Sequence, residues 1–150
     1  MNPSRRFLLL ALGAPAAAWA DSLSADDRRA VRATIEAQLQ ALAAGDAVQA
    51  FSHASPDIQR QFGDAETFIA MVRQGYPMVI RPAATVFFQA EWLGGAVVQV
   101  VQVVQVVQFR DAAGQRWLAT YRLVKLADQL NQPWRIKGVA VVADSGKSST

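Results

Sequence analysis

The sequence has no cysteine and a single histidine, His53, and these two shortages exclude several kinds of site. Without thiolates and with one imidazole, the chain lacks the ligands that transition metals prefer, so we expect no metal site. Ser55 and Asp57 lie near His53, but no nucleophile elbow accompanies them, and a histidine near a helix C-terminus is favoured by the helix dipole. Gly94-Gly95 lacks the surroundings of a phosphate loop. We therefore expect neither catalysis at His53 nor a cofactor.

Charge is scarce and nearly balanced in most of the chain. The 15 basic and 12 acidic side chains include two arginines close to the N-terminus; without those two, the rest has 13 against 12, a net charge of +1. Such a domain has no electrostatic footprint for nucleic acid, so we expect no nucleic-acid partner. Without disulfides, it must be stabilised by its apolar core.

The first twenty residues have the parts of a cleavable export signal. A basic pair precedes the apolar run Phe7–Leu12, and the small residues Ala18 and Ala20 stand where a signal peptidase requires them. We expect residues 1–20 to be a signal peptide and the mature protein to be periplasmic or secreted. The apolar run is shorter than the ~20 residues of a membrane span, so we expect no stable span after cleavage.

Two alternatives to an ordinary signal stay open. Ser4-Arg5-Arg6-Phe7-Leu8-Leu9 resembles a twin-arginine motif, which directs folded proteins to a separate export route. The apolar segment can also stay uncleaved as an anchor. In either case, the remaining chain has the length of one domain, which we expect at residues 21–144. We expect the polar tail at residues 145–150 to be disordered.

Helix start and stop signals punctuate the first half of the domain. Four capping residues each precede a segment with apolar residues at helical spacing, and glycines follow three of these segments. The expected N-caps are Ser24, Asp46, Ser55 and Asp64, and the expected stops are Gly45, Gly63 and Gly75. We therefore predict four helices, the first of which buries Ile35 and Leu39.

The second half of the domain has the alternating pattern of strands. We predict strands over Thr85–Leu93, Ala96–Arg110, Trp117–Leu123 and Trp134–Val142, with a hairpin turn at Gly94-Gly95. The residues expected to face the core are Val86, Phe88, Ala90 and Trp92 on the first strand, and Trp134, Ile136, Gly138, Ala140 and Val142 on the last. Helices followed by an antiparallel meander predict an α+β fold, in which N-terminal helices pack on a curved four-stranded sheet and form a cone-like roll.

A repeat occupies much of the second predicted strand. Val97–Gln108 consists of Val-Val-Gln four times over, and its valines favour a strand. Side chains of a strand alternate between its two faces, and a repeat of three residues does not match this alternation. Either some glutamines therefore face the core or the strand bulges. A slide of three residues restores the same residue types, so only the turns at the two ends can fix the register. The uncharged, proline-free run is also prone to aggregation.

Four aromatic residues are the candidates for a ligand pocket. They fall on the apolar faces of three predicted strands, where they either belong to the core or line a cavity with one edge in contact with water. These residues are Trp92, Trp117, Tyr121 and Trp134.

The order of several short motifs resembles a known family. Leu39–Asp46, Ser55-Pro56, Asp111–Gly114, Ala119–Leu123 and Trp134–Gly138 together resemble the domain of unknown function 4864, a family of exported proteobacterial proteins within the nuclear-transport-factor-2-like superfamily. The resemblance covers about residues 28 to 142. It implies a cone with a pocket and supplies no catalytic residues, because the superfamily includes both enzymes and binding modules.

We therefore expect a non-catalytic domain that binds a small apolar ligand or a partner protein, with a homodimer also possible. One alternative is a small acid–base enzyme of the isomerase or dehydratase kind, with Glu91 or Asp64 acting beside Tyr76 or Tyr121. Another is a structural component of the envelope, with a filled core and an exposed apolar patch. A carboxylate facing the pocket would favour the enzyme, and a lining without one would favour binding.

Overall fold

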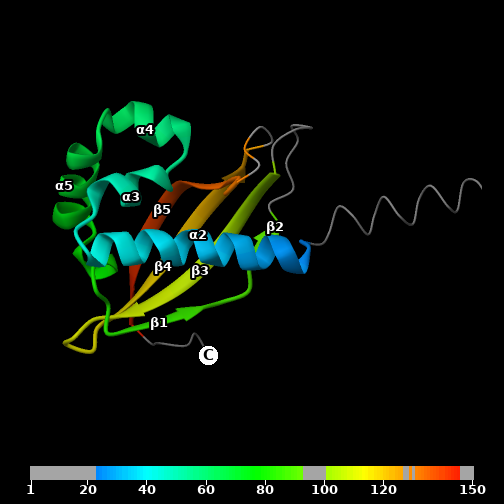
Figure 1. Cartoon of the computed structure of the whole chain (residues 1–150). Helices are drawn as coiled ribbons and strands as arrows, with labels where there is room; N and C mark the ends of the chain where they lie inside the picture. The colour runs from blue at the N-terminus through cyan, green and yellow to red at the C-terminus, as the bar shows by residue number, and fades with distance from the viewer. Residues whose placement is uncertain (1–22, 93–100, 127–128, 130, 146–150) are drawn as a thin grey trace, which may run out of the picture.

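Helices lie against one face of a curled antiparallel sheet in the computed structural model, which describes residues 23–92, 101–126, 129 and 131–145. The long helix α2 (Ala25–Ala43) crosses the sheet, and α3 (Ala47–Ser52), α4 (Pro56–Phe62) and α5 (Ala65–Gly75) gather near one end of it (Figure 1). A short 3-10 helix, η1 (Pro77–Val79), leads into the strands. The predicted α+β architecture is confirmed, and the sheet is curled but not closed.

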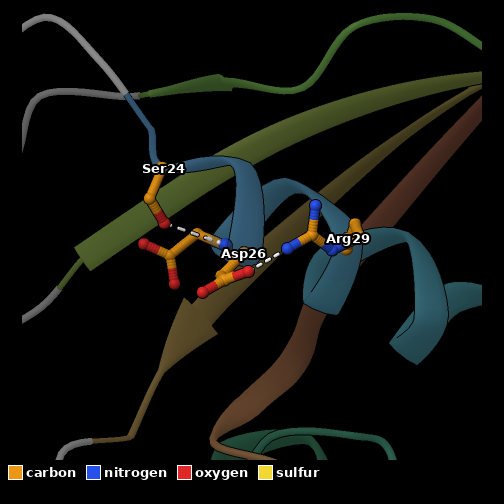
Figure 2. Close-up of polar contacts among 4 residues, drawn as sticks. Ser24, Asp26 and Arg29 are labelled. Atoms are coloured by element: carbon orange, nitrogen blue, oxygen red, sulfur yellow. Dashed lines mark hydrogen bonds and ion pairs between the residues drawn. The ribbon is translucent and has the colours of Figure 1, made fainter.

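The four helices begin where their local capping signals predict. Ser24 accepts a hydrogen bond from the backbone N–H of Asp27 at 2.9 Å, as Figure 2 shows at the start of α2. Asp46, Ser55 and Asp64 cap the other three helices in the same way. Gly45 follows α2 with φ +70, a left-handed conformation that glycine adopts without steric cost. Each cap satisfies backbone groups that a helix end leaves without partners.

The sheet has the strand order β1-β3-β4-β5, with β2 also paired with β3. The strands are β1 (Ala84–Phe87), β2 (Glu91–Trp92), β3 (Val101–Arg110), β4 (Arg116–Lys125) and β5 (Trp134–Asp144). All of the pairings between these strands are antiparallel. Asp111 forms the β3–β4 turn by accepting hydrogen bonds from the backbone of Ala113 and Gln115. The meander is thus as predicted, but its first strand is broken.

The prediction for the first strand is wrong in its extent and in the facing of Val86 and Phe88, whereas Ala90 is buried as predicted. Val86 and Phe88 are each 47% exposed, whereas Phe87 packs against the core beneath the guanidinium of Arg32. The pairing stops at Phe87. Phe88 still donates its backbone N–H to the carbonyl of Val106 at 2.9 Å, but its own carbonyl accepts a hydrogen bond from the side chain of Gln105. The strand resumes only at Glu91.

Gln105 is a glutamine of the repeat that faces the core, one of the two outcomes that the period of three predicts. It is only 2% exposed, and its amide also donates to the carbonyl of Val106 at 3.1 Å. On the same strand, Val107 and Phe109 are fully buried, and Phe109 packs edge-on against Tyr121. The chain between β1 and β2 therefore provides a hydrogen-bond acceptor, the carbonyl of Phe88, for the buried amide.

The facing of the last strand is predicted correctly at its start and wrongly after that. Trp134 and Ile136 are buried, as expected. The register between β4 and β5 then shifts, because Arg122 pairs with Gly138 and Leu123 with Ile136, so Lys137 is the extra residue of a bulge. The bulge moves Val139 and Val141 onto the core, while Val142 is 61% exposed.

Several sequence predictions lie outside the described residues. These are the signal peptide at 1–20, the turn at Gly94-Gly95, the first four residues of the repeat and most of the tail. Across the described residues, no helix combines the length and the apolarity that crossing a membrane requires.

Candidate functional site

A pocket opens between the short helices and the curled sheet. It has a volume of about 230 Å³ and is formed by side chains of α2, α4, α5, η1, β4 and β5. We call it the helix–sheet pocket. Its lining residues are mostly apolar: Leu42, Ala54, Ile58, Phe62, Phe68, Met71, Val72, Val79, Ile136, Gly138 and Val139, together with Gln38, Gln61, Tyr76 and Tyr121.

Local sequence and one backbone connection place these walls. The side chain of Ser55 caps α4. Two backbone hydrogen bonds tie the same segment to the sheet: Ser55 donates its N–H to the carbonyl of Ile136, and Ile136 donates its N–H to the carbonyl of His53, each at 2.8 Å. The start of α4 is therefore fixed to the edge of β5. Ring contacts of Phe68 with Phe51 and Phe62, at centroid distances of 5.3 and 5.8 Å, hold α5 against α3 and α4.

Two polar side chains are buried in this otherwise apolar lining. Tyr121, on β4, is 1% exposed, and burial raises the pKa of its hydroxyl well above the usual value, so the phenol stays protonated. Gln38, on α2, donates from its amide nitrogen to the carbonyl of Ala50 at 3.1 Å. Its amide oxygen keeps the capacity to accept a hydrogen bond. The pocket thus offers a neutral hydroxyl and an amide oxygen.

The Tyr121 hydroxyl has no hydrogen-bond partner among the described residues. Tyr121 lines the helix–sheet pocket, so a bound molecule could supply that partner. By contrast, the second amide side chain of the lining, Gln61, is exposed on α4 and belongs to the rim. The buried polar groups are therefore those that could orient a ligand.

The four aromatic candidates are not brought together. Only Tyr121 lines the helix–sheet pocket. Trp117 is half-buried and donates from its indole to Asp111 at 3.3 Å. Trp92 lies in β2 opposite Val103. Trp134 lines a separate groove, which it shares with His53 and with Ala30, Ala33 and Thr34 of α2.

Trp134 is a core residue with one unusual feature. It is 1% exposed, and the Nζ atom of Lys125 lies 5.8 Å from its ring centroid. Its indole N–H is fully buried and has no hydrogen-bond partner among the described residues. His53, in the same groove, has its pKa lowered by burial and, secondarily, by the charge of Arg135, so it is neutral at pH 7.

The residues considered for acid–base chemistry do not meet. Asp64 caps α5 by accepting from the backbone of Thr67 at 2.8 Å, and that hydrogen bond lowers the pKa of its carboxyl. Glu91 is exposed on β2. Neither carboxylate lines the helix–sheet pocket, although Tyr76 and Tyr121 both do. Nowhere in the described part of the chain do three or more His, Asp or Glu side chains gather in a way that could hold a metal ion.

Sequence patterns left several pocket residues unassigned, and one of them had a visible signal. Gln38 stands on the buried stripe of α2, three residues after Ile35 and four before Leu42. A polar residue on a helix's apolar stripe requires a partner, and this pattern could have identified it. Met71 and Val139 had no such signal, because their place depends on how α5 and the bulged β5 pack together.

Comparison with known proteins gives one match. The family model described as Domain of unknown function (DUF4864) matches residues 24–149 of the chain. No curated protein and no solved structure matches the chain. The resemblance to this family drawn from the short motifs is thereby confirmed.

Proposed function

The chain belongs to the Domain of unknown function (DUF4864) family, and we propose that it binds a small apolar ligand in the helix–sheet pocket. The observation that carries this proposal is the lining itself. Aliphatic and aromatic side chains surround a space of about 230 Å³, and the lining includes no Asp, Glu, Lys, Arg or His. A pocket of this composition supports binding rather than the acid–base catalysis considered from the sequence, which would need a carboxylate beside one of the tyrosines.

The volume sets the size of the ligand. An apolar cavity of about 150 Å³ holds a benzene-sized molecule, whereas pockets for drug-sized ligands begin at about 300 Å³. At about 230 Å³, the helix–sheet pocket suits a molecule between these sizes. Removal of its apolar surface from water would stabilise the complex by about 25 cal/mol per Å², before the cost of immobilising the ligand.

The direct test is to look for a ligand that stays bound during purification. The mature protein would be purified from its host, extracted with organic solvent and analysed by mass spectrometry. We expect a small apolar compound in stoichiometric amount. A Val139→Trp variant should lose it, because residue 139 lines the pocket and is half-buried, so a larger side chain can fill the space.

The matched control is Val142→Trp, on the same strand. Residue 142 is exposed and does not line the pocket, so this variant should retain the compound. Equal amounts of compound in both variants would contradict binding in the helix–sheet pocket.

A partner protein is the second candidate, and the outer face of the sheet favours it. Val86 and Val142 lie on this face, joined through the paired residues Gln108 and Leu118, and Phe88 is exposed beside them. Exposed apolar groups on one face are typical of interaction surfaces. Analytical ultracentrifugation of the mature domain tests the simplest partner, a second copy: a concentration-dependent dimer that Val142→Arg abolishes would support it, and a monomer at all concentrations would contradict it.

We also propose that the domain acts after export, in the periplasm or outside the cell, and that it belongs to the nuclear-transport-factor-2-like superfamily. The basic pair, apolar run and small-residue cleavage site at the N-terminus support export. The order of helices before a curled antiparallel sheet supports the superfamily placement.

A further inference from the structure

The helix–sheet pocket combines an apolar wall with two buried polar groups and no charge. The titratable side chains in its lining are Tyr76 and Tyr121, and no acidic or basic side chain of α2, α4, α5, η1, β4 or β5 belongs to the lining. A charged group on a ligand would lose water there without meeting an opposite charge. Burial of this kind strongly disfavours a charged form.

We propose that the pocket selects an uncharged ligand whose single polar end hydrogen-bonds to Tyr121 and Gln38. The inference rests on the proposed binding function and narrows it to a chemical class: a neutral amphiphile such as an alcohol, a ketone or an amide. Acids are admitted in their protonated form only, and amines in their neutral form only.

The geometry of the two polar side chains supports this class. Both are among the most buried residues of the lining, at 1% for Tyr121 and 5% for Gln38. The Gln38 amide nitrogen is committed to the carbonyl of Ala50, which leaves the amide oxygen to accept. The Tyr121 hydroxyl can both donate and accept. A ligand hydroxyl can therefore donate to Gln38 and accept from Tyr121, which a pure hydrocarbon cannot do.

Three probes of one size separate these effects: phenylbutanol, phenylbutyrate and butylbenzene. All three have the same ring and a four-carbon chain, and they differ only in the terminal group. Calorimetric titration of the mature protein should show that phenylbutanol binds with an affinity that is constant between pH 5 and pH 8. Phenylbutyrate should weaken about tenfold for each pH unit above its own pKa, because only the protonated acid enters.

The Tyr121→Phe variant tests the polar anchor. It removes a hydroxyl that has no partner in the described residues, so the domain should fold normally. Affinity for phenylbutanol should fall about threefold to tenfold, the loss of one hydrogen bond, while affinity for butylbenzene should not change. Tyr76→Phe is the matched control, since residue 76 lines the same pocket but is half-exposed, and it should change neither affinity by more than about twofold.

The outcomes distinguish the inference from the function on which it rests. If none of the three probes binds, the proposed function fails and the inference fails with it. If all three bind but phenylbutyrate is as tight at pH 8 as phenylbutanol, ligand binding stands and the selection for neutral ligands is overturned. If Tyr121→Phe weakens phenylbutanol and butylbenzene equally, the polar anchor is overturned.

Discussion

Substitution of Gln105 by leucine is the most informative change to the sheet. Its amide is buried in the core and donates to the carbonyls of Phe88 and Val106. Leucine has a similar volume and cannot donate, so the carbonyl of Phe88 loses its side-chain partner. The net loss of one hydrogen bond costs about 0.5–1.5 kcal/mol, and the amide of Gln105 donates two, so the loss is about 1–3 kcal/mol. Gln105→Leu should lower the free energy of unfolding by that amount.

A shift of register could hide this loss, and the energies decide against it. A slide of three residues would bring Gln108 to the position of Gln105 and restore the amide. The same slide would remove Phe109, which is fully buried, from its contact with Tyr121. Loss of a buried phenylalanine costs about 3–5 kcal/mol. Because this cost exceeds the gain, the strand should keep its register and the loss should be measurable.

The assay is urea unfolding of the mature domain, followed by tryptophan fluorescence. Gln108→Leu is the control, since Gln108 is half-buried and donates to Asp144 at 3.0 Å on the outer face. This substitution should cost about 0.5 kcal/mol, the low end for one hydrogen bond. Equal losses in the two variants, or a more stable Gln105→Leu protein, would refute the reasoning that a buried amide holds the break between β1 and β2.

Four further predictions concern other parts of the chain. Trp134→Ala should cost about 3–5 kcal/mol in urea unfolding, whereas Trp134→Phe should cost far less, since it also removes the buried N–H that lacks a partner; equal costs would contradict this. Burial lowers the pKa of His53 in the folded state, so the unfolded chain binds a proton at a higher pH, and the free energy of unfolding should fall as the pH drops through 6.5. The His53→Asn variant should show a weaker pH dependence of that free energy, and an unchanged dependence would contradict the prediction. Deletion of Val97–Gln102 preserves both the triplet and the strand alternation, so that protein should fold and aggregate less than the parent in a light-scattering assay, while a three-residue deletion should be the worse of the two; the opposite ranking would show that this segment is not one regular strand. N-terminal sequencing of the protein recovered from a periplasmic fraction should begin at Asp21, and a retained Met1 would contradict cleavage.

The sequence predicts those parts of the fold that depend on neighbouring residues. Ser24, Asp46, Ser55 and Asp64 cap helices because the hydrogen bond of each spans only three residues. The buried face of β4, including Tyr121, follows from simple alternation.

What the sequence missed depends on distant residues. The first strand breaks where Gln105, seventeen positions away, bonds to Phe88. The last strand changes its facing because Lys137 bulges opposite β4. Alternation alone contains neither event, so Val86 and Val142 were placed in the core although both are exposed.

The candidate site was predicted only in part, because it too depends on residues that are distant in the sequence. Tyr121 was identified because it lies on an apolar strand face, but Trp117 and Trp134 have the same pattern and lie elsewhere. The pocket arises where α4 and α5 meet the sheet, and that meeting depends on the backbone bonds between Ser55 and Ile136.

Methyl NMR of the mature domain titrated with phenylbutanol would locate bound ligand directly. If the helix–sheet pocket is the binding site, the methyl signals of Ile58, Val72 and Val139 should shift in a saturable manner, because these residues line it. The signals of Val86 and Val142, which are exposed on β1 and β5, should stay in place. Saturable shifts confined to Val86 and Val142, or no saturable shifts at all, would contradict binding in the pocket.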